Sequence, residues 1–471
     1  MELNIRQRRK LVGYLILSAL SFAYLILAPQ AGIAISIFVL LQLVYLYFLL
    51  PRKLPILAML PVLAFGLNAV LSANLMWRIP NLFVAFALYS VMTLWIQKEL
   101  NLTESLPQFL QNICGNLGHA FAHFREPVAW GAEAQEEHLP LIKRIMIGIM
   151  ISIPCLIFLA FMLSRADAIF YHTGLRFFDW LSRIIGMDTL WRIFVGILAG
   201  FYLFGLIYPM FVKKEKKEPL MREARRGDLM ILNIVLVSVL LMYTLFVVIQ
   251  FRYLFAPPNG LPYGLNFVHY ARRGFFELLF LTAVNILFIL IAVWLSKEQK
   301  GTWAKLTKIL CLYLCAVTVV LLVSSFYRMW LYSSDDGLTR LRFLVFGFLI
   351  FEAIGLGFTF VYIIRPKFNI IAVYLVIALT YYMLLNLVPM DQIIAKNQID
   401  RYFETGRGGI AYTLTLSPDA APEIARLLDS ERAQTRQNTE FYLLWTENLA
   451  ETRSDWRQWN LSISRAAEFR R

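Results

Sequence analysis

The sequence predicts an all-α protein: a polytopic bundle of about eleven transmembrane helices with a small soluble helical module at its C-terminal end. Three observations lead to this prediction. Hydrophobic residues make up 59% of the 471 residues, charged residues only 16%, and the mean hydropathy is +0.62, which is far from the values of soluble domains. The apolar residues form runs of roughly 20, the length that crosses a bilayer. From Pro389 onward the composition becomes that of a soluble helical protein.

Each expected span is an apolar run bounded by polar residues, glycine or proline. In chain order these runs are 11–28, 32–50, 54–72, 80–97, 145–163, 191–212, 229–250, 273–295, 306–326, 341–364 and 369–388. They divide the chain into a two-hairpin membrane region at 1–98, a cytoplasmic linker at 99–144, a main membrane domain at 145–388 and a C-terminal helical domain at 389–471.

Basic residues predict the orientation of the chain, because Lys and Arg are retained on the cytoplasmic side of membrane proteins. The net charge of +14 comes largely from short clusters between apolar runs, so we do not expect a nucleic-acid partner. Placing the N-terminus in the cytoplasm puts most clusters there: Arg6 to Lys10, Arg52 with Lys53, Lys143 with Arg144, the KKEKKE run from Lys213, Lys297 to Lys308, and Arg365 with Lys367. An odd number of spans then places the C-terminal domain outside, whereas one span more or fewer would reverse that side.

Three connecting segments have patterns of their own. From Ser105, a helix cap, apolar residues recur with helical spacing as far as Phe124, which predicts an amphipathic helix on the inner membrane surface. A second amphipathic segment, at 164–186, is expected on the outer surface. The loop at 251–273 contains Pro257, Pro258, Asn259 and Gly260 and is expected to be an ordered outer lid.

The C-terminal domain is expected to contain four helices. The first runs from Asp391 to Glu404 and ends at a glycine-rich stretch. Ser417 and Pro418 have the pattern of a helix cap and first turn, and predict a second helix through Leu428. A third helix is expected from about Glu431 to Thr452, and a fourth near Trp456.

Ionisable residues next to or inside the spans are the candidate functional groups, because such residues are costly in a bilayer. Glu277 lies one helical turn from Arg273, so the two could neutralise each other. Alternatively, Glu277 contacts Arg340 and Arg342 of another span and closes an outer polar vestibule. The vestibule residues are Arg165, Asp167, Tyr270, Arg272, Arg273, Glu277, Asn285, Arg340 and Arg342.

Glu352 is the candidate intramembrane carboxyl. Roughly 15 Å of helix separates it from the nearest arginines on either side, so no local partner is available. It is either a neutral packing carboxyl that accepts a hydrogen bond, with Tyr381, Tyr382 or Asn386 as the expected donors, or a proton or cation site.

No catalytic, metal or cofactor motif is present in the sequence. The HExxH, Gly-rich phosphate-loop and Ser/His/Asp patterns are all missing, so we expect no cofactor and favour a non-enzymatic protein. His119 with His123, and Cys311 with Cys315, have one-turn spacing but no third ligand nearby. They are interpreted as a polar helix face and as apolar packing.

Several segments carry a family resemblance. They are RADAIF at Arg165, HYARRGFFELLFLTAVN at His269, DDGLTRLRF at Asp335, NLVPMDQIIAKNQIDRYFETG at Asn386, YTLTLSPDAAPEIARLL at Tyr412 and DWRQWNLSISRA at Asp455. Through them the chain resembles the bacterial membrane family catalogued as domain of unknown function 4173, which is related to the family numbered 4153. The resemblance implies a multi-pass protein of the bacterial cytoplasmic membrane and no established activity.

Two functions are compatible with these features. The first is an envelope binding, sensing or organising protein that contacts a ligand or protein partner on its outer side, since the recognised segments gather there. The second is a secondary transporter or channel for a proton or small solute that uses Glu352 and Glu277. A membrane enzyme acting on lipid-linked substrates at Asp167, His269 and the outer arginines ranks last, because no nucleophile or base is recognisable.

Overall fold

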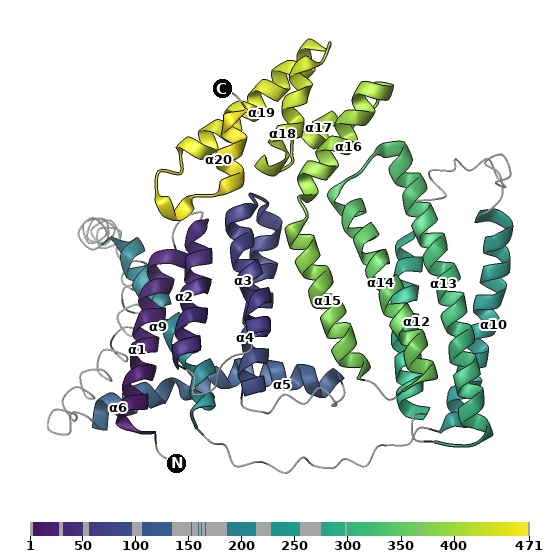
Figure 1. The fold of residues 1–471 in the computed structure, drawn as a ribbon, viewed down its shortest axis with the longest axis horizontal. Coiled ribbons are helices and arrows are strands. Elements are labelled where there is room, and N and C mark those ends of the chain that lie inside the picture. The colour runs from purple at the N-terminus through teal and green to yellow at the C-terminus, as the bar shows by residue number, and fades with distance from the viewer. Residues whose placement is uncertain are drawn as a thin grey trace.

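The protein is a row of membrane helices, and a helical cap lies over the helix ends on one side of this layer (Figure 1). The computed structural model describes residues 3–27, 32–49, 56–96, 106–133, 186–212, 228–254, 275–296, 299–366 and 369–469, and the single positions 152, 159, 162 and 165. Within these residues every regular element is a helix. The all-α prediction is therefore confirmed.

The helices of the membrane layer follow the expected apolar runs closely. They are α1 (Ile5–Ser21), α2 (Ile33–Leu49), α3 (Ile56–Leu71), α4 (Arg78–Ile96), α9 (Met187–Ile207), α10 (Leu229–Leu254), α12 (Phe275–Ser296), α13 (Thr302–Asp336), α14 (Arg340–Ile364) and α15 (Ile370–Leu387). Seven helical segments in the described residues are long and apolar enough to cross a membrane, and three more are shorter apolar helices. The expected span at 145–163, the amphipathic segment at 164–186 and the lid that follows α10 lie largely outside the described residues.

The first bundle contains α1 to α4 and α9, which share one apolar core. Its tightest contact is between α1 and α9. Gly196 and Gly200 of α9, four residues apart, face Ala23 and Ala19; Ala19 belongs to α1, and Ala23 belongs to the π-helical segment Phe22–Ile26 that follows it. A Cβ at Gly200 would lie 2.7 Å from the Cβ of Ala19, and one at Gly196 would lie 2.6 Å from the Cβ of Ala23. Small residues with this spacing let two helix backbones approach closely in a membrane.

The second bundle contains α10, α12, α13 and α14, whose buried residues form a separate core. Helix α13 differs from its prediction, which ended at residue 326. It continues to Asp336 and has 35 residues, about 50 Å of helix, which exceeds the roughly 30 Å hydrocarbon core of a bilayer. Its last turns project beyond α12 toward the cap (Figure 1).

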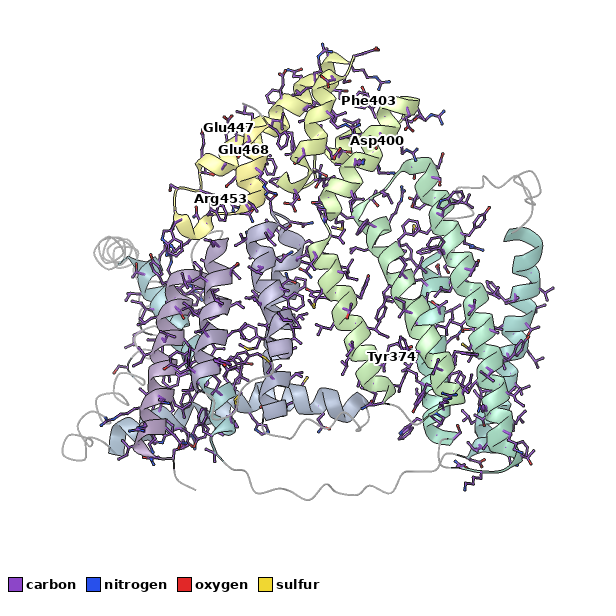
Figure 2. The ribbon with its side chains drawn as sticks, in the orientation of Figure 1. Tyr374, Asp400, Phe403, Glu447, Arg453 and Glu468 are labelled. Atoms are coloured by element: carbon purple, nitrogen blue, oxygen red, sulfur yellow. The ribbon has the colours of Figure 1, made fainter. Side chains whose placement is uncertain are left out.

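Helix α15 stands between the two bundles (Figure 1). On one side the hydroxyl of Tyr374, labelled among the membrane helices in Figure 2, donates to the carbonyl of Gly355 on α14 at 2.9 Å. On the other side Asn81 of α4 donates to the side chain of Asn386 at 2.8 Å, and Asn68 of α3 donates to the Asn386 carbonyl at 2.8 Å. The three asparagines are buried. They link α15 to the first bundle by buried hydrogen bonds.

Two helices, α5 (Leu106–His119) and α6 (Arg125–Glu133), lie across the ends of the spans on the side where α1 begins (Figure 1). A 3₁₀ segment, Ala120–Phe124, joins them. The helix expected after Ser105 is thus present and lies flat against the bundle. It packs through Leu117 and Ala120, which contact the core of the first bundle.

The C-terminal cap comprises α16 (Met390–Thr405), α17 (Ile410–Thr413), α18 (Ala421–Ile424), α19 (Ala433–Glu451) and α20 (Leu461–Glu468). It lies at the end of the layer opposite the start of α1 (Figure 1). Its own core contains Ile394, Ile399, Ile424, Leu427 and Leu443. Asp400 and Phe403 lie at the end of α16 that is remote from the membrane helices (Figure 2).

One expected element of the cap is helical at its predicted position but differs in the type of helix. The second helix, predicted from Ser417 to Leu428, is broken into the four residues of α18 with 3₁₀ turns at Pro418–Ala420 and Ala425–Asp429. The hydroxyl of Ser417 makes no capping hydrogen bond. Ser417 and Asp419 are used elsewhere, as described below.

Candidate functional site

The candidate site lies where the cap meets the membrane helices, and its centre is the carboxylate of Asp391. Asp391 lies in the first turn of α16, just after α15 ends, and its side chain is fully buried. Arg340, the first residue of α14, approaches it with two nitrogens: Nε to Oδ1 at 2.8 Å and Nη2 to Oδ2 at 2.6 Å. This two-point geometry is the strongest form of an arginine–carboxylate pair.

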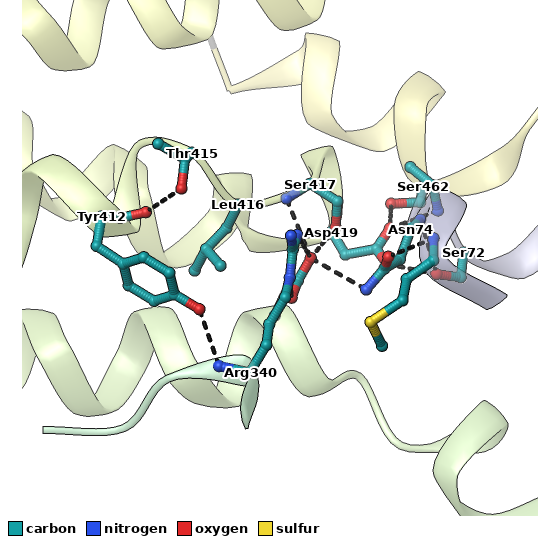
Figure 3. Close-up of polar contacts among 12 residues, drawn as sticks. Ser72, Asn74, Arg340, Tyr412, Thr415, Leu416, Ser417, Asp419 and Ser462 are labelled. Carbon is teal, nitrogen blue, oxygen red and sulfur yellow. Dashed lines mark hydrogen bonds and ion pairs between the residues drawn. The ribbon is translucent and has the colours of Figure 1, made fainter. Parts of the chain in front are cut away.

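Two further segments complete the hydrogen bonding of Asp391 through Ser417 and Asn74, both of which are labelled in Figure 3. Ser417 donates its hydroxyl at 2.5 Å and its backbone N–H at 3.1 Å to Oδ2. Asn74, in the turn between α3 and α4, donates its side-chain amide at 3.3 Å. Burial by itself would raise the pKa of Asp391, but the hydrogen bonds from Arg340 and Ser417 hold the pKa below its ordinary value. The carboxylate is therefore charged at neutral pH and joins four segments of the chain.

A second carboxylate, that of Asp419, attaches the cap to the same turn. It accepts the hydroxyl of Ser72 at 2.6 Å and the backbone N–H of Ala73 at 2.8 Å. The hydroxyl of Ser462, on α20, donates to it as well (Figure 3). Asn460 then donates to the carbonyls of Ala69 at 3.0 Å and Ser72 at 2.9 Å. The end of α3, whose carbonyls have no helical partners, is thus capped by the C-terminal region.

The cap also reaches the start of α2. The backbone N–H groups of Gly32 and Ile33 donate to the carbonyls of Arg457 at 2.8 Å and Trp459 at 2.9 Å. A Cβ at Gly32 would lie 2.2 Å from the carbonyl oxygen of Trp459, so only glycine fits there without displacement. Arg457 in turn donates to the carbonyl of Tyr24 at 2.8 Å. Residues from opposite ends of the sequence form this contact.

Arg342, expected in the vestibule, is held beside the cap junction by residues at the end of α13. Its Nη2 lies 2.8 Å from Oδ2 of Asp336, its Nη1 donates to the carbonyl of Gly337, and its guanidinium stands over the ring of Tyr332, 3.7 Å from the centroid. Arg340 and Arg342 are thus bound to different carboxylates. The expected contact of both with Glu277 does not form among the described residues.

The remaining vestibule residues are dispersed. Glu277 lies exposed in the first turn of α12, and Arg165 is exposed at an isolated described position. Asn285 is buried within the second bundle, where it accepts from Tyr243 at 2.8 Å and donates to Thr318 at 3.2 Å. The other four, Asp167, Tyr270, Arg272 and Arg273, lie outside the described residues, and so does the expected pair of Arg273 with Glu277.

Glu352 is buried in the middle of α14, with 3% of its surface exposed. Its hydrogen-bond donor is Thr282 of α12, whose hydroxyl lies 2.7 Å from Oε2. The expected donors act elsewhere: Tyr381 donates to a backbone carbonyl of α14, and Tyr382 and Asn386 belong to the asparagine cluster between α15 and the first bundle. In the part of the chain that is described, Oε1 of Glu352 has no hydrogen-bond partner.

The possible metal ligands do not converge. His123 packs against the ring of Tyr208, with centroids 4.8 Å apart. Cys311 and Cys315 are free and lie in the core of the second bundle. Over the described ranges, no three side chains of His, Cys, Asp or Glu lie close enough together to hold a metal ion.

The sequence reasoning missed Asp391 and Asp419 as site residues. Both lie in the family-like segments, and each follows a proline near the start of a helix, where a carboxylate suits the helix dipole. Their partners are remote: Asn74 is 317 residues from Asp391, and Ser72 is 347 residues from Asp419. Local periodicity contains no information about contacts at that separation.

These features define a class: a polytopic helical membrane protein whose C-terminal cap is hydrogen-bonded to the turns of its membrane helices. The chain belongs to the family described as Domain of unknown function (DUF4153), which it matches over residues 59–427. This is the family numbered 4153; membership of the family numbered 4173 is not confirmed. Neither the curated proteins nor the solved structures give a match. Arg340, Asp391 and Asp419 all lie within the matched residues.

Proposed function

We propose that this protein is a non-enzymatic binding or sensing protein of a bacterial cytoplasmic membrane, with its N-terminus in the cytoplasm and its cap outside. The orientation is supported by the basic clusters between the spans. The position of the cap, at the end of the layer opposite the start of α1, supports it further (Figure 1).

The observation that carries this proposal is the coordination of Asp391. One carboxylate contacts Arg340 of the second bundle, Asn74 of the first bundle and Ser417 of the cap. A ligand that shifts the cap must therefore change contacts to both bundles. A ligand can bias an equilibrium between two arrangements only by its differential affinity for them, and this junction connects the outer surface to the membrane helices.

The exposed surface of the cap has the chemistry of a contact surface for a protein partner. Phe441 and Trp445 lie one turn apart on α19 and are 60% and 47% exposed. Phe403 on α16 is 46% exposed. Exposed aromatic side chains are enriched where proteins bind one another, and these three do not serve the core of the cap.

A reporter fused after Arg471 tests the orientation that the proposal needs. We expect alkaline phosphatase at this position to be active, because it folds only outside the cytoplasm, and green fluorescent protein to be dark. A photocrosslinking residue at Phe441 should then give adducts in intact cells that are missing at Lys396, an exposed polar position on α16. An inactive phosphatase fusion together with a fluorescent green fluorescent protein fusion would place the cap in the cytoplasm and contradict the proposal.

A transporter or channel is the second candidate, and the buried carboxyl of Glu352 favours it. With Oε1 lacking a partner in the described chain, this group has the polarity of a proton site inside a bilayer. Purified protein in liposomes tests the idea by dye-monitored proton flux. If the binding function is correct, wild type and Glu352→Gln should both match empty liposomes. A wild-type flux that Glu352→Gln abolishes would establish the transporter instead.

A further inference from the structure

A pocket of about 210 Å³ opens at the cap-side ends of three helices in the second bundle. It is lined by Phe275 of α12, by Arg328, Met329 and Tyr332 of α13, and by Leu341 and Arg342 of α14. It lies beside the cap junction but shares neither Arg340 nor Asp391. Its residues form the outer end of the second bundle, at the level where the membrane helices begin and end.

The pocket combines buried positive charge with apolar walls. Arg328 is 5% exposed and Arg342 is 6% exposed, although arginine is seldom fully buried without a specific reason. The carboxylate of Asp336, which is half-exposed, lies against Arg342. The guanidinium groups of Arg328 and Arg342 both line the pocket, together with the apolar side chains of Phe275, Met329 and Leu341.

The guanidinium of Arg342 has donors to spare. Two of its nitrogens bind Gly337 and Asp336, but a guanidinium carries five N–H bonds. Its plane is fixed over the ring of Tyr332, so it is held in place before any ligand arrives. Planar arginine forks suit the oxygens of a phosphate or carboxylate.

The size of the pocket limits what fits. A drug-sized ligand is usually enclosed by roughly 300–1,000 Å³, so 210 Å³ holds a headgroup rather than a whole amphiphile. The rest of such a molecule would extend past the largely exposed side chain of Leu341 into the bilayer. This suits a ligand with one anionic end and one long apolar end.

We propose that this pocket binds the headgroup phosphate of an anionic phospholipid through Arg328 and Arg342. The acyl chains follow the apolar mouth of the pocket into the surrounding membrane. This site goes beyond the proposed function of the cap, since it needs no movement of the cap and would persist if the cap proved to have another role.

The test is a calorimetric titration in which dioctanoyl phosphatidylglycerol is added to purified full-length protein in detergent. We expect saturable binding that Arg328→Gln and Arg342→Gln each weaken by about tenfold or more, the usual size of a lost charge-assisted hydrogen bond. Lys308→Gln is the matched control: it removes a cation near the opposite end of α13, where Lys308 contacts the carbonyl of Ile364, and should leave the affinity unchanged.

A second pair of variants keeps both arginines in place. Leu341 is 57% exposed, so Leu341→Glu should fold and put a negative charge at the mouth of the pocket. It should weaken phosphatidylglycerol binding by about tenfold relative to Leu341→Gln. The two Leu341 variants test phosphatidylglycerol binding at the pocket even if an arginine variant fails to fold.

Three outcomes would overturn the proposal. The first is equal affinity in Leu341→Glu and Leu341→Gln. The second is an equal loss on Lys308→Gln, which would mean general attraction of anionic lipid to basic residues. The third is inorganic phosphate binding as tightly as phosphatidylglycerol, which would identify a free anion as the ligand. Weak inorganic phosphate binding with strong phosphatidylglycerol binding supports the lipid.

Discussion

Asp391→Ala is expected to lower the free energy of unfolding by about 3–5 kcal/mol, the usual cost of breaking a buried ion pair by removing one partner. The substitution leaves Arg340 without its counter-charge and removes the acceptor for Ser417 and Asn74. Unfolding in increasing SDS, with limited proteolysis of the cap as a second readout, measures the effect. The cap should become susceptible to protease before the membrane helices unfold.

The matched control is Arg426→Gln, which breaks two surface ion pairs within the cap, with Asp400 at 2.8 Å and with Glu423 at 2.9 Å. Exposed pairs contribute about 0–1 kcal/mol. Lowering the pH should reproduce part of the loss in unfolding free energy that Asp391→Ala causes. Because the folded-state pKa of Asp391 is depressed, its stabilisation is full above the ordinary pKa of 3.8 and is lost as the pH falls through the lower folded value. Equal effects of Asp391→Ala and Arg426→Gln would mean that the junction does not hold the cap.

Gly200→Val is expected to have the second largest effect and to lower the free energy of unfolding by about 1–3 kcal/mol. The double variant Gly196→Val with Gly200→Val should lower it considerably more. The added side chains must displace α1, because even a Cβ at Gly200 would lie 2.8 Å from the carbonyl oxygen of Leu15. The separation of α1 from α9 would open the core of the first bundle. The same SDS unfolding assay measures the loss.

The control for helix propensity is Gly357→Val on α14, where a Cβ would meet no atom within 4 Å. It introduces the same residue into a membrane helix without a neighbour to displace. We expect little change or a small gain in stability, since glycine is a poor helix former. A loss at Gly357 as large as that at Gly200 would show that the effect comes from valine itself rather than from the contact between α1 and α9.

Much of the fold could be predicted from the sequence, because a bilayer requires long apolar helices and those are visible in the composition. Nearly every expected run has a helix at its position. The main error in length, the ten extra residues of α13 to Asp336, has a physical reason. Hydrophobicity marks where a helix leaves the membrane, not where it ends, and residues beyond the interface are free to be polar.

The candidate site could be predicted only in part. Arg340, Arg342 and Glu352 were found because charge is rare near membrane spans, but their partners were not. Thr282 was not considered for Glu352, since a threonine is common in membrane helices and shows nothing distinctive. Asp391 lies in a region of ordinary soluble composition, where a charged residue attracts no notice. Contacts between segments hundreds of residues apart depend on packing that no local pattern reveals.

The contact of Gly32 with Trp459 has a consequence for how the molecule is completed during synthesis. At translation rates of roughly 5–20 residues per second, the 427 residues from Ile33 to Trp459 take roughly 20–90 s to produce. The first two helices must remain in the membrane for that time with the start of α2 uncovered. The N–H groups of Gly32 and Ile33 acquire their acceptors only after Arg457 and Trp459 have been made, so a segment synthesised much later completes the contacts of the first helices.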